Sequence, residues 1–184
     1  TSPRLKQRLS VSWQKHMIAR ACGIKHHFKP RILDVTGGLG RDAFSLAFFK
    51  CPVTMVERSP IIACLLEDGL ARLKQQKLAI DLSLIVMDAL DYLSTITEKP
   101  DVIYIDPMYP KRQKSALGQK ELRVLRDIVG TDDDAERLLH LSLSKATKRV
   151  VVKRPRLANP LSTIPATIIY TGRSSRFDVY IIQS

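Results

Sequence analysis

The chain has 184 residues, 45% of them hydrophobic, and the excess of Lys and Arg over Asp and Glu gives it a net charge of +12. This length and apolar content fit one domain with a sizeable core and exclude a disordered chain, and no apolar stretch is long and uncharged enough to cross a bilayer. The charge favours a polyanionic partner such as nucleic acid. Because the first residues lead into no apolar signal segment and the three cysteines form no CxxC pair, we expect a cytoplasmic protein with no disulfide and no metal site.

The hydrophobic pattern predicts helices and strands that alternate along the chain. The expected elements are a helix over 12–22, a strand over 31–35, a helix over 41–49, a strand over 52–57, a helix from 60, a strand over 82–87, a helix over 89–96, a strand over 101–106, helices near 120–129 and 132–146, a strand over 149–153, and a hairpin of 167–170 with 177–182. Ser59 and Pro60 are typical of a helix start. The apolar residues that follow are expected to face the core: Ile61, Ile62, Leu65, Leu66 and Leu70. The alternation predicts an α/β fold with a doubly wound, mostly parallel seven-stranded sheet and a C-terminal antiparallel hairpin.

Acidic residues end the first four predicted strands, at the edge where open α/β sheets bind ligands. They are Asp34, which precedes a loop with Gly37, Gly38 and Gly40, and then Glu57, Asp88 and Asp106. Glycines let a ligand approach the backbone, Glu57 suits ribose hydroxyls, and Asp88 with the N–H of Ala89 suits an adenine edge. Any one of these acids could instead cap a helix, but four in register indicate a cofactor that carries a nucleoside.

The stretch Asp106-Pro107-Met108-Tyr109-Pro110 places an acidic acceptor beside an aromatic ring. This pair suits a planar group with an exocyclic amine, which indicates a nucleobase, and a plain turn after a strand is the alternative. Basic residues follow this loop and also end the fifth strand. Those expected to contact RNA phosphates are Lys111, Arg112, Lys114, Lys120, Arg123, Lys153 and Arg154. A solvated basic face is the alternative for each of them.

The residues around the glycine loop distinguish the cofactor classes that share such a loop. The dinucleotide fingerprint G-x-G-x-x-G is only partly met, because Arg41-Asp42-Ala43 follows the last glycine, and no Walker A lysine is present. The Asp-Pro-Met-Tyr element resembles the [D/N]-P-P-[Y/F] motif of methyltransferases that use S-adenosylmethionine (SAM) to modify exocyclic amines, with Met108 at the second proline. The loop that begins at Asp34 resembles their D-x-G-x-G-x-G, with Thr36 at the first glycine.

Longer matches narrow this resemblance to one family. Five segments are similar, in order, to the RsmJ-type 16S rRNA guanine-N2 methyltransferases: 33–44 (LDVTGGLGRDAF), Glu57-Arg58-Ser59-Pro60, 106–110 with 114–117, 146–155 and 176–180. The resemblance implies a Rossmann-like class I methyltransferase. Such an enzyme would transfer a methyl group from SAM to the N2 amine of a guanine in 16S rRNA of the small ribosomal subunit, leaving S-adenosylhomocysteine.

The resemblance also implies roles for individual residues. Contacts with SAM would come from Arg41, Asp42, Glu57, Arg58, Asp88, Ala89 and Asp106, beside Asp34, Gly37, Gly38 and Gly40 of the loop. In the reaction, Asp106 and the carbonyl of Pro107 would accept the hydrogens of the amine. Tyr109 would stack on a base extracted from its helix, and an apolar lid without substrate contact is the alternative.

Family members usually carry a small N-terminal domain of several dozen residues. We therefore expect residues 1–30 to form a helical lead-in, as a remnant of that domain or an approach from it, to a methyltransferase domain over 31–184. Two other functions stay open: an adenine-N6 or other nucleic-acid amino-methyltransferase, and a non-catalytic RNA-binding protein on this fold. The glycines and Asp106 favour an enzyme.

Overall fold

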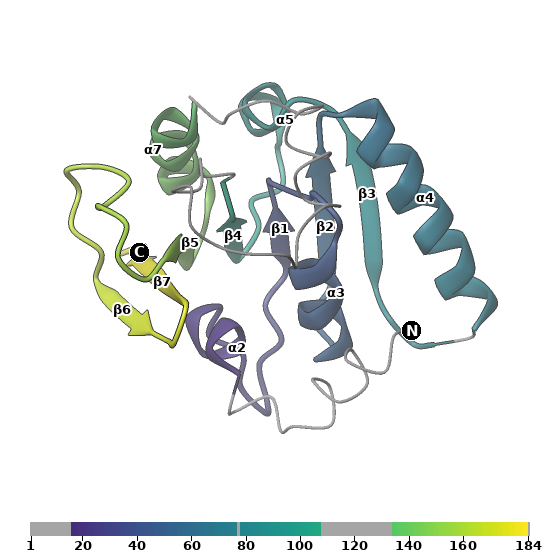
Figure 1. Cartoon of the computed structure of the whole chain (residues 1–184), viewed down its shortest axis with the longest axis horizontal. Helices are drawn as coiled ribbons and strands as arrows, with labels where there is room; N and C mark the ends of the chain where they lie inside the picture. The colour runs from purple at the N-terminus through teal and green to yellow at the C-terminus, as the bar shows by residue number, and fades with distance from the viewer. Residues whose placement is uncertain (1–15, 77, 108–133, 184) are drawn as a thin grey trace.

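Seven strands form one sheet in the computed structural model, which describes residues 16–76, 78–107 and 134–183 (Figure 1). They are β1 (Ile32–Asp34), β2 (Val53–Glu57), β3 (Leu82–Val86), β4 (Val102–Ile105), β5 (Arg149–Pro155), β6 (Ile168–Thr171) and β7 (Ser175–Ile181). Their order is β3-β2-β1-β4-β5-β7-β6, in which β1 to β5 run parallel and β7 runs antiparallel to both β5 and β6. The predicted parallel sheet with an antiparallel C-terminal hairpin is confirmed.

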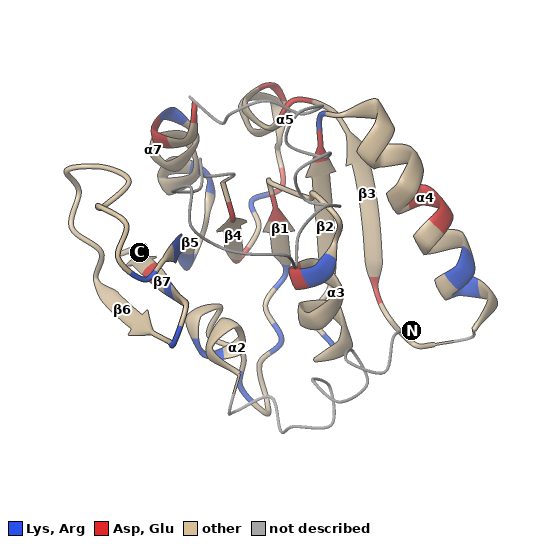
Figure 2. Cartoon of the chain, in the orientation of Figure 1, with Lys and Arg blue, Asp and Glu red and all other residues tan. Residues whose placement is uncertain are grey.

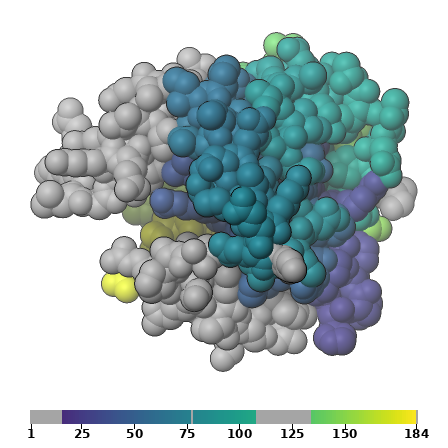
Figure 3. Space-filling model, turned by 90° about the vertical axis from the view of Figure 1, so that its right-hand side faces the viewer, coloured from purple at the N-terminus to yellow at the C-terminus, as the bar shows by residue number. Residues whose placement is uncertain are grey.

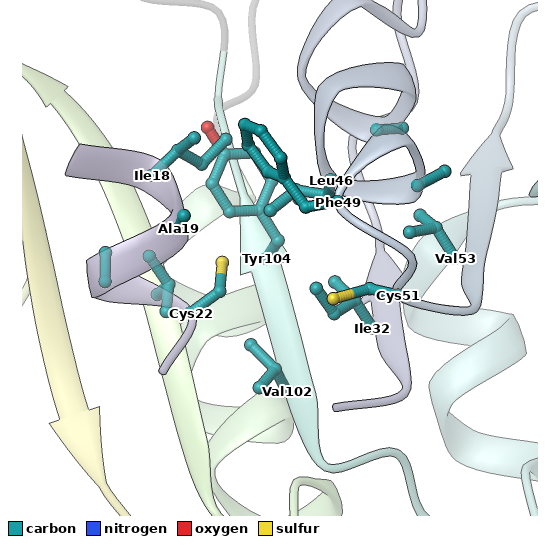
Figure 4. Close-up of a cluster of buried hydrophobic side chains, with 14 of the residues drawn as sticks. Ile18, Ala19, Cys22, Ile32, Leu46, Phe49, Cys51, Val53, Val102 and Tyr104 are labelled. Carbon is teal, nitrogen blue, oxygen red and sulfur yellow. The ribbon is translucent and has the colours of Figure 1, made fainter. Parts of the chain in front are cut away.

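Helices pack on both faces of this sheet. One face carries α2 (Met17–Ala21), α3 (Arg41–Phe48) and α4 (Pro60–Gln75), and the other carries α5 (Ala89–Thr95) and α7 (Ala135–Lys145). The strand β4 is apolar throughout because both of its faces are covered. Tyr104 packs in the core on the side of α2, α3 and α4, and Ile103 and Ile105 pack in the core on the side of α5 and α7. Figure 4 shows Tyr104 between α2 and α3, near the buried cysteines Cys22 and Cys51. None of the helices described is long and apolar enough to cross a membrane.

The strand β5 is tied to the end of α2. Arg149 Nη1 donates a hydrogen bond to the carbonyl oxygen of Ala21 at 3.0 Å. Gly23 follows with a φ of +70°, and a Cβ at this position would lie 2.6 Å from Arg149 Cζ. The positive φ favours glycine here, and a larger residue would also displace the guanidinium of Arg149. The helix predicted over 12–22 is present as Met17–Ala21, and residues 12–15 lie outside the described part of the chain.

The outer side of α4 corrects one prediction. The helix begins as predicted, with the Ser59 hydroxyl accepting from the N–H of Ile62 and Pro60 as first helical residue. Ile62 and Leu66 are buried, but Ile61 and Leu65 are 53% and 52% exposed instead of facing the core. The reason is that β3 is the edge strand, so α4 packs on the sheet along one side only and runs across the surface that faces the viewer in Figure 3. The helix predicted near 120–129 lies outside the described residues.

Candidate functional site

A pocket of about 370 Å³ opens at the carboxyl ends of β1, β2 and β4. It brings together all the residues for which a cofactor contact is predicted, and also Pro107: Asp34, Gly37, Gly38, Gly40, Arg41, Asp42, Glu57, Arg58, Asp88, Ala89 and Asp106. Figure 2 shows acidic residues at the ends of β1, β2 and β4 and a basic and an acidic residue at the start of α3, all on the same edge of the sheet. A pocket of this volume falls within the usual range for small-molecule sites.

The glycine loop is shaped mainly by its own packing. Gly38 and Gly40 have φ angles of +49° and +66°, which favour glycine. A Cβ on Gly40 would lie 2.9 Å from Leu66 Cδ2, and one on Gly37 would lie 3.1 Å from the carbonyl oxygen of Val56. The glycines therefore let the loop turn tightly against β2 and α4 before α3 begins at Arg41.

Glu57 is held by backbone N–H groups from two directions. Its Oε2 accepts from the N–H of Gly38 at 2.8 Å, and its Oε1 accepts from the N–H of Ser59 at 2.8 Å. Only 7% of the residue is exposed. Each carboxylate oxygen has a second lone pair, so a carboxylate fixed in this way can still accept hydrogen bonds from the hydroxyls of a ribose.

Asp88 adopts the capping geometry that was the alternative reading of the strand-end acids. Its Oδ1 accepts from the N–H of Leu90 at 2.8 Å and from that of Asp91 at 3.4 Å, and so caps α5. Its Oδ2 lies 3.8 Å from Arg58 Nη1, which also donates to Asp134 Oδ2 at 3.3 Å. This chain of charges joins the start of α5 to the start of α7 along the rim of the pocket. Apolar side chains line the pocket nearby: Ile62, Met87 and Leu138.

Thr36 links the ends of β1 and β4, a function that sequence reasoning missed. Asp34 Oδ1 accepts from the N–H of Thr36 at 3.0 Å and from its hydroxyl at 3.2 Å, and the same hydroxyl accepts from the N–H of Asp106 at 2.7 Å. Burial raises the pKa of Asp34 from 3.8 to about 7; the Thr36 N–H lowers it, and the carboxylates of Asp42 and Asp106 raise it. A hydroxyl residue two positions after Asp34, where related motifs carry glycine, was the available signal.

Lys153 was predicted to contact RNA phosphates, but it lines the pocket. Its Nζ donates to Asp42 Oδ2 and to Asp106 Oδ2, each at 2.7 Å, and the hydroxyl of Tyr104 donates to Asp42 Oδ2 at 2.7 Å. Burial lowers the pKa of Lys153, but Asp106 and Asp42 outweigh it and raise that pKa above its ordinary value. Burial, followed by Asp42, raises the pKa of Tyr104. Lys153 is therefore a cation held between two carboxylates.

Arg154 also differs from its prediction as an RNA contact. The side chain is buried, and its guanidinium donates to the carbonyl oxygen of Asn159. The strand β5 continues to Pro155 and pairs with β7 along its whole length, so Arg154 belongs to the sheet and not to an exposed rim. Arg156 is the next exposed basic residue after it. Tyr109 and the other predicted RNA contacts lie outside the described residues: Lys111, Arg112, Lys114, Lys120 and Arg123.

Within the described ranges, no group of three or more His, Cys, Asp or Glu side chains is arranged to hold a metal ion. The residues present fit SAM: a buried carboxylate at the end of β2 would accept from the ribose, apolar side chains would flank the adenine, and further carboxylates would balance the positive charge of the sulfonium. Each of these groups lines the same pocket.

Comparisons with known proteins agree with this geometry. Residues 3–182 match the model of the family described as "Putative SAM-dependent methyltransferase". The chain is 54% identical over 179 residues to ribosomal RNA small subunit methyltransferase J of Coxiella burnetii, covering 96% of this chain and 70% of that protein. It is 50% identical over 169 residues to the protein of the same name from Yersinia enterocolitica, covering 89% of this chain and 67% of that protein.

A solved structure gives the same picture. The crystal structure of a SAM-dependent methyltransferase from Neisseria gonorrhoeae superposes with a TM-score of 0.75 at 36% identity, covering 96% of this chain and 71% of that one. The chain is therefore a member of the SAM-dependent methyltransferase family that includes the ribosomal RNA small subunit methyltransferases J.

Proposed function

We propose that this chain methylates the N2 amine of a guanine in the 16S rRNA of the small ribosomal subunit, with SAM as methyl donor, in the cytoplasm. The observation that carries the proposal is the position of Asp106. It directly follows β4, lines the pocket together with the glycine loop and Glu57, and is followed by Pro107. A hydrogen-bond acceptor for an amine thus stands beside the predicted SAM contacts.

The pocket residues divide between the parts of SAM. Glu57 would accept from the ribose hydroxyls, and the apolar side chains of Ile62, Met87 and Leu138 would flank the adenine. Asp88 and Ala89 would meet the adenine edge, with the Asp88 oxygen that does not cap α5 as the acceptor. The donor, when bound, supplies a methyl group already activated as a sulfonium, so the protein has to position the amine.

The amine of guanine is a poor nucleophile because its lone pair is delocalised into the ring. The carboxylate of Asp106 and the carbonyl of Pro107 would accept its two hydrogens and direct the nitrogen toward the methyl group. Alignment of two reactants can lower a barrier by roughly 7–11 kcal/mol, which makes orientation the main contribution expected of these residues. Tyr109 would stack on the extracted base.

RNA as the substrate is supported by charge and by the relatives. The net charge of +12 suits a polyanion, and proteins 50–54% identical to the chain are named small subunit rRNA methyltransferases. We propose phosphate contacts for Lys111, Arg112, Lys114, Lys120 and Arg123, and for the exposed Arg156 in place of Arg154. Residues 31–184 would form the catalytic domain, with 1–30 as its lead-in.

The test is transfer of a radiolabelled methyl group from SAM to small ribosomal subunits, to free 16S rRNA and to duplex DNA. Nucleoside chromatography after digestion should yield N2-methylguanosine from the RNA. N6-methyladenosine would support the adenine alternative instead. Binding of SAM and of RNA without any transfer would support a non-catalytic RNA-binding protein. The Asp106→Ala variant, which removes the acceptor, should still fold and lose transfer.

A further inference from the structure

Four polar side chains form one continuous chain of hydrogen bonds across the floor of the pocket. Tyr104 on β4 donates to Asp42 at the start of α3, and Lys153 on β5 donates both to the same oxygen of Asp42 and to Asp106. Each of the three donor–acceptor distances is 2.7 Å. Three elements of the fold therefore hold the carboxylate that would face the target amine.

The ammonium of Lys153 reduces the repulsion between the carboxylates of Asp42 and Asp106. Asp42 and Asp106 approach one another closely enough to share a single cation, and Asp34 is near enough to both for its own pKa to be raised by them. Carboxylates that share a site repel, so one of them tends to bind a proton unless a cation lies between them. Lys153 is that cation, and its side chain is only 28% exposed.

Stability alone is a poor reason to keep such an arrangement. Desolvation of charged groups cancels much of the attraction within a buried ion pair, and apolar residues of similar volume often serve the fold equally well. Lysine also has a long flexible side chain, which is restricted here by two acceptors and by burial. The charges are better explained by the acceptor that they orient.

We propose that Lys153 is a positioning residue for methyl transfer: it fixes the ionised Asp106 carboxylate toward the amine, and Asp42 and Tyr104 fix Lys153. The inference rests on the proposed function. In the reaction, a bond forms between the amine nitrogen and the methyl carbon as the carbon–sulfur bond breaks, and its electron pair stays on sulfur. The nitrogen then releases one proton to Asp106 and from there to water. Because an alkylated, protonated aryl amine is a strong acid, a carboxylate of weak basicity is sufficient for this step.

The experiment compares Lys153→Met with Lys153→Arg and with Lys148→Met. Lys148 is a matched control, since it is an exposed lysine 3.8 Å from Asp101, just before β5 begins. For each variant, kcat and KM on small ribosomal subunits, the Kd for SAM and the thermal unfolding temperature are measured. Lys153→Met should lower kcat by about 10- to 100-fold without weakening SAM binding, because misplacement of a reacting group costs rate and not affinity. Lys153→Arg should recover part of the loss, and Lys148→Met should match the unmodified chain.

A double variant tests whether the residues act as one unit. Asp42→Asn alone should reduce kcat, because Lys153 loses an anchor, but it should add no further loss to Lys153→Met. A merely structural function for Lys153 predicts a lower unfolding temperature and weaker SAM binding in proportion to the lost activity, and that result would overturn the inference. Wild-type kcat in Lys153→Met, or losses that multiply in the double variant, would overturn it as well. An absence of transfer by the unmodified chain would overturn the proposed function and this inference together.

Discussion

Replacing Thr36 with valine should separate the two functions of its hydroxyl from the shape of its side chain. Valine keeps the branched form but removes the hydrogen bond to Asp34 Oδ1 and leaves the N–H of Asp106 without its acceptor at 2.7 Å. A net hydrogen bond contributes about 0.5–1.5 kcal/mol, and a donor left unsatisfied costs about 1–3 kcal/mol. Both atoms are partly buried, so we expect Thr36→Val to lower the free energy of unfolding by about 2–3 kcal/mol.

The assay has two readouts that should change together. For a chain of this size, a loss of about 2–3 kcal/mol corresponds to a thermal unfolding temperature roughly 5–10 °C lower. Methyl transfer should fall further than stability explains, because Asp106 begins the loop that would hold the amine. Single-turnover transfer at a temperature where the variant is fully folded measures this second effect.

Thr36→Ser is the control, since serine keeps the hydroxyl and loses only a methyl group. It should retain most of the transfer rate and of the stability. If Thr36→Val transfers methyl groups as fast as Thr36→Ser, the hydroxyl does not position Asp106 and the reasoning is wrong.

Three further predictions test other parts of the structure. Folding raises the pKa of Asp34 from 3.8 to about 7, so between these pH values the folded state holds a proton that the unfolded state has lost. The free energy of unfolding should therefore fall as the pH rises through this range, by up to about 4 kcal/mol. Denaturant titrations at several pH values should show a flatter pH dependence for Asp34→Asn. Gly40→Ala should destabilise the chain by about 1–3 kcal/mol through its positive φ and the clash with Leu66, whereas Gly69→Ala, in open space on α4, should stabilise it by up to about 1 kcal/mol in the same thermal assay. Arg156→Ala should weaken RNA binding and lower its salt dependence by about one ion, and an equal loss for Arg72→Ala on the far end of α4 would contradict a specific contact.

The sheet and the acidic edge could be predicted from the sequence because both follow from short-range patterns. Apolar runs that alternate with amphipathic stretches predict parallel strands, and parallel strands bring their carboxyl ends to one edge. Once Asp34, Glu57 and Asp106 are placed at strand ends, their convergence follows from topology alone. The residues that line the pocket could therefore be predicted without any information on side-chain geometry.

The hydrogen-bonded chain through Lys153 could not be predicted in the same way. Lys153 lies 111 residues from Asp42 and 47 from Asp106, and no local pattern says that these three groups meet. The adjacent Lys153 and Arg154 look like a basic pair on a rim, but a strand sends neighbouring side chains to opposite faces, and here both sides are covered. The prediction that Ile61 and Leu65 of α4 face the core was wrong for a related reason. An apolar stripe on a helix does not reveal that the strand beside it, β3, is the edge of the sheet.

The pocket is acidic and the chain as a whole is basic, a distribution that suits the cationic SAM and the polyanionic RNA. Six acidic side chains and three basic ones line the pocket among the described residues, although the chain as a whole carries +12. With the pKa of Asp34 at about 7, the pocket keeps an excess of two to three negative charges at neutral pH. An acidic pocket would stabilise a cationic sulfonium more than the neutral thioether that transfer leaves behind, so we expect the product to bind less tightly than the donor. The basic charge of the remaining chain attracts the RNA, and Lys153 is the pocket cation that is bound by two of those acids.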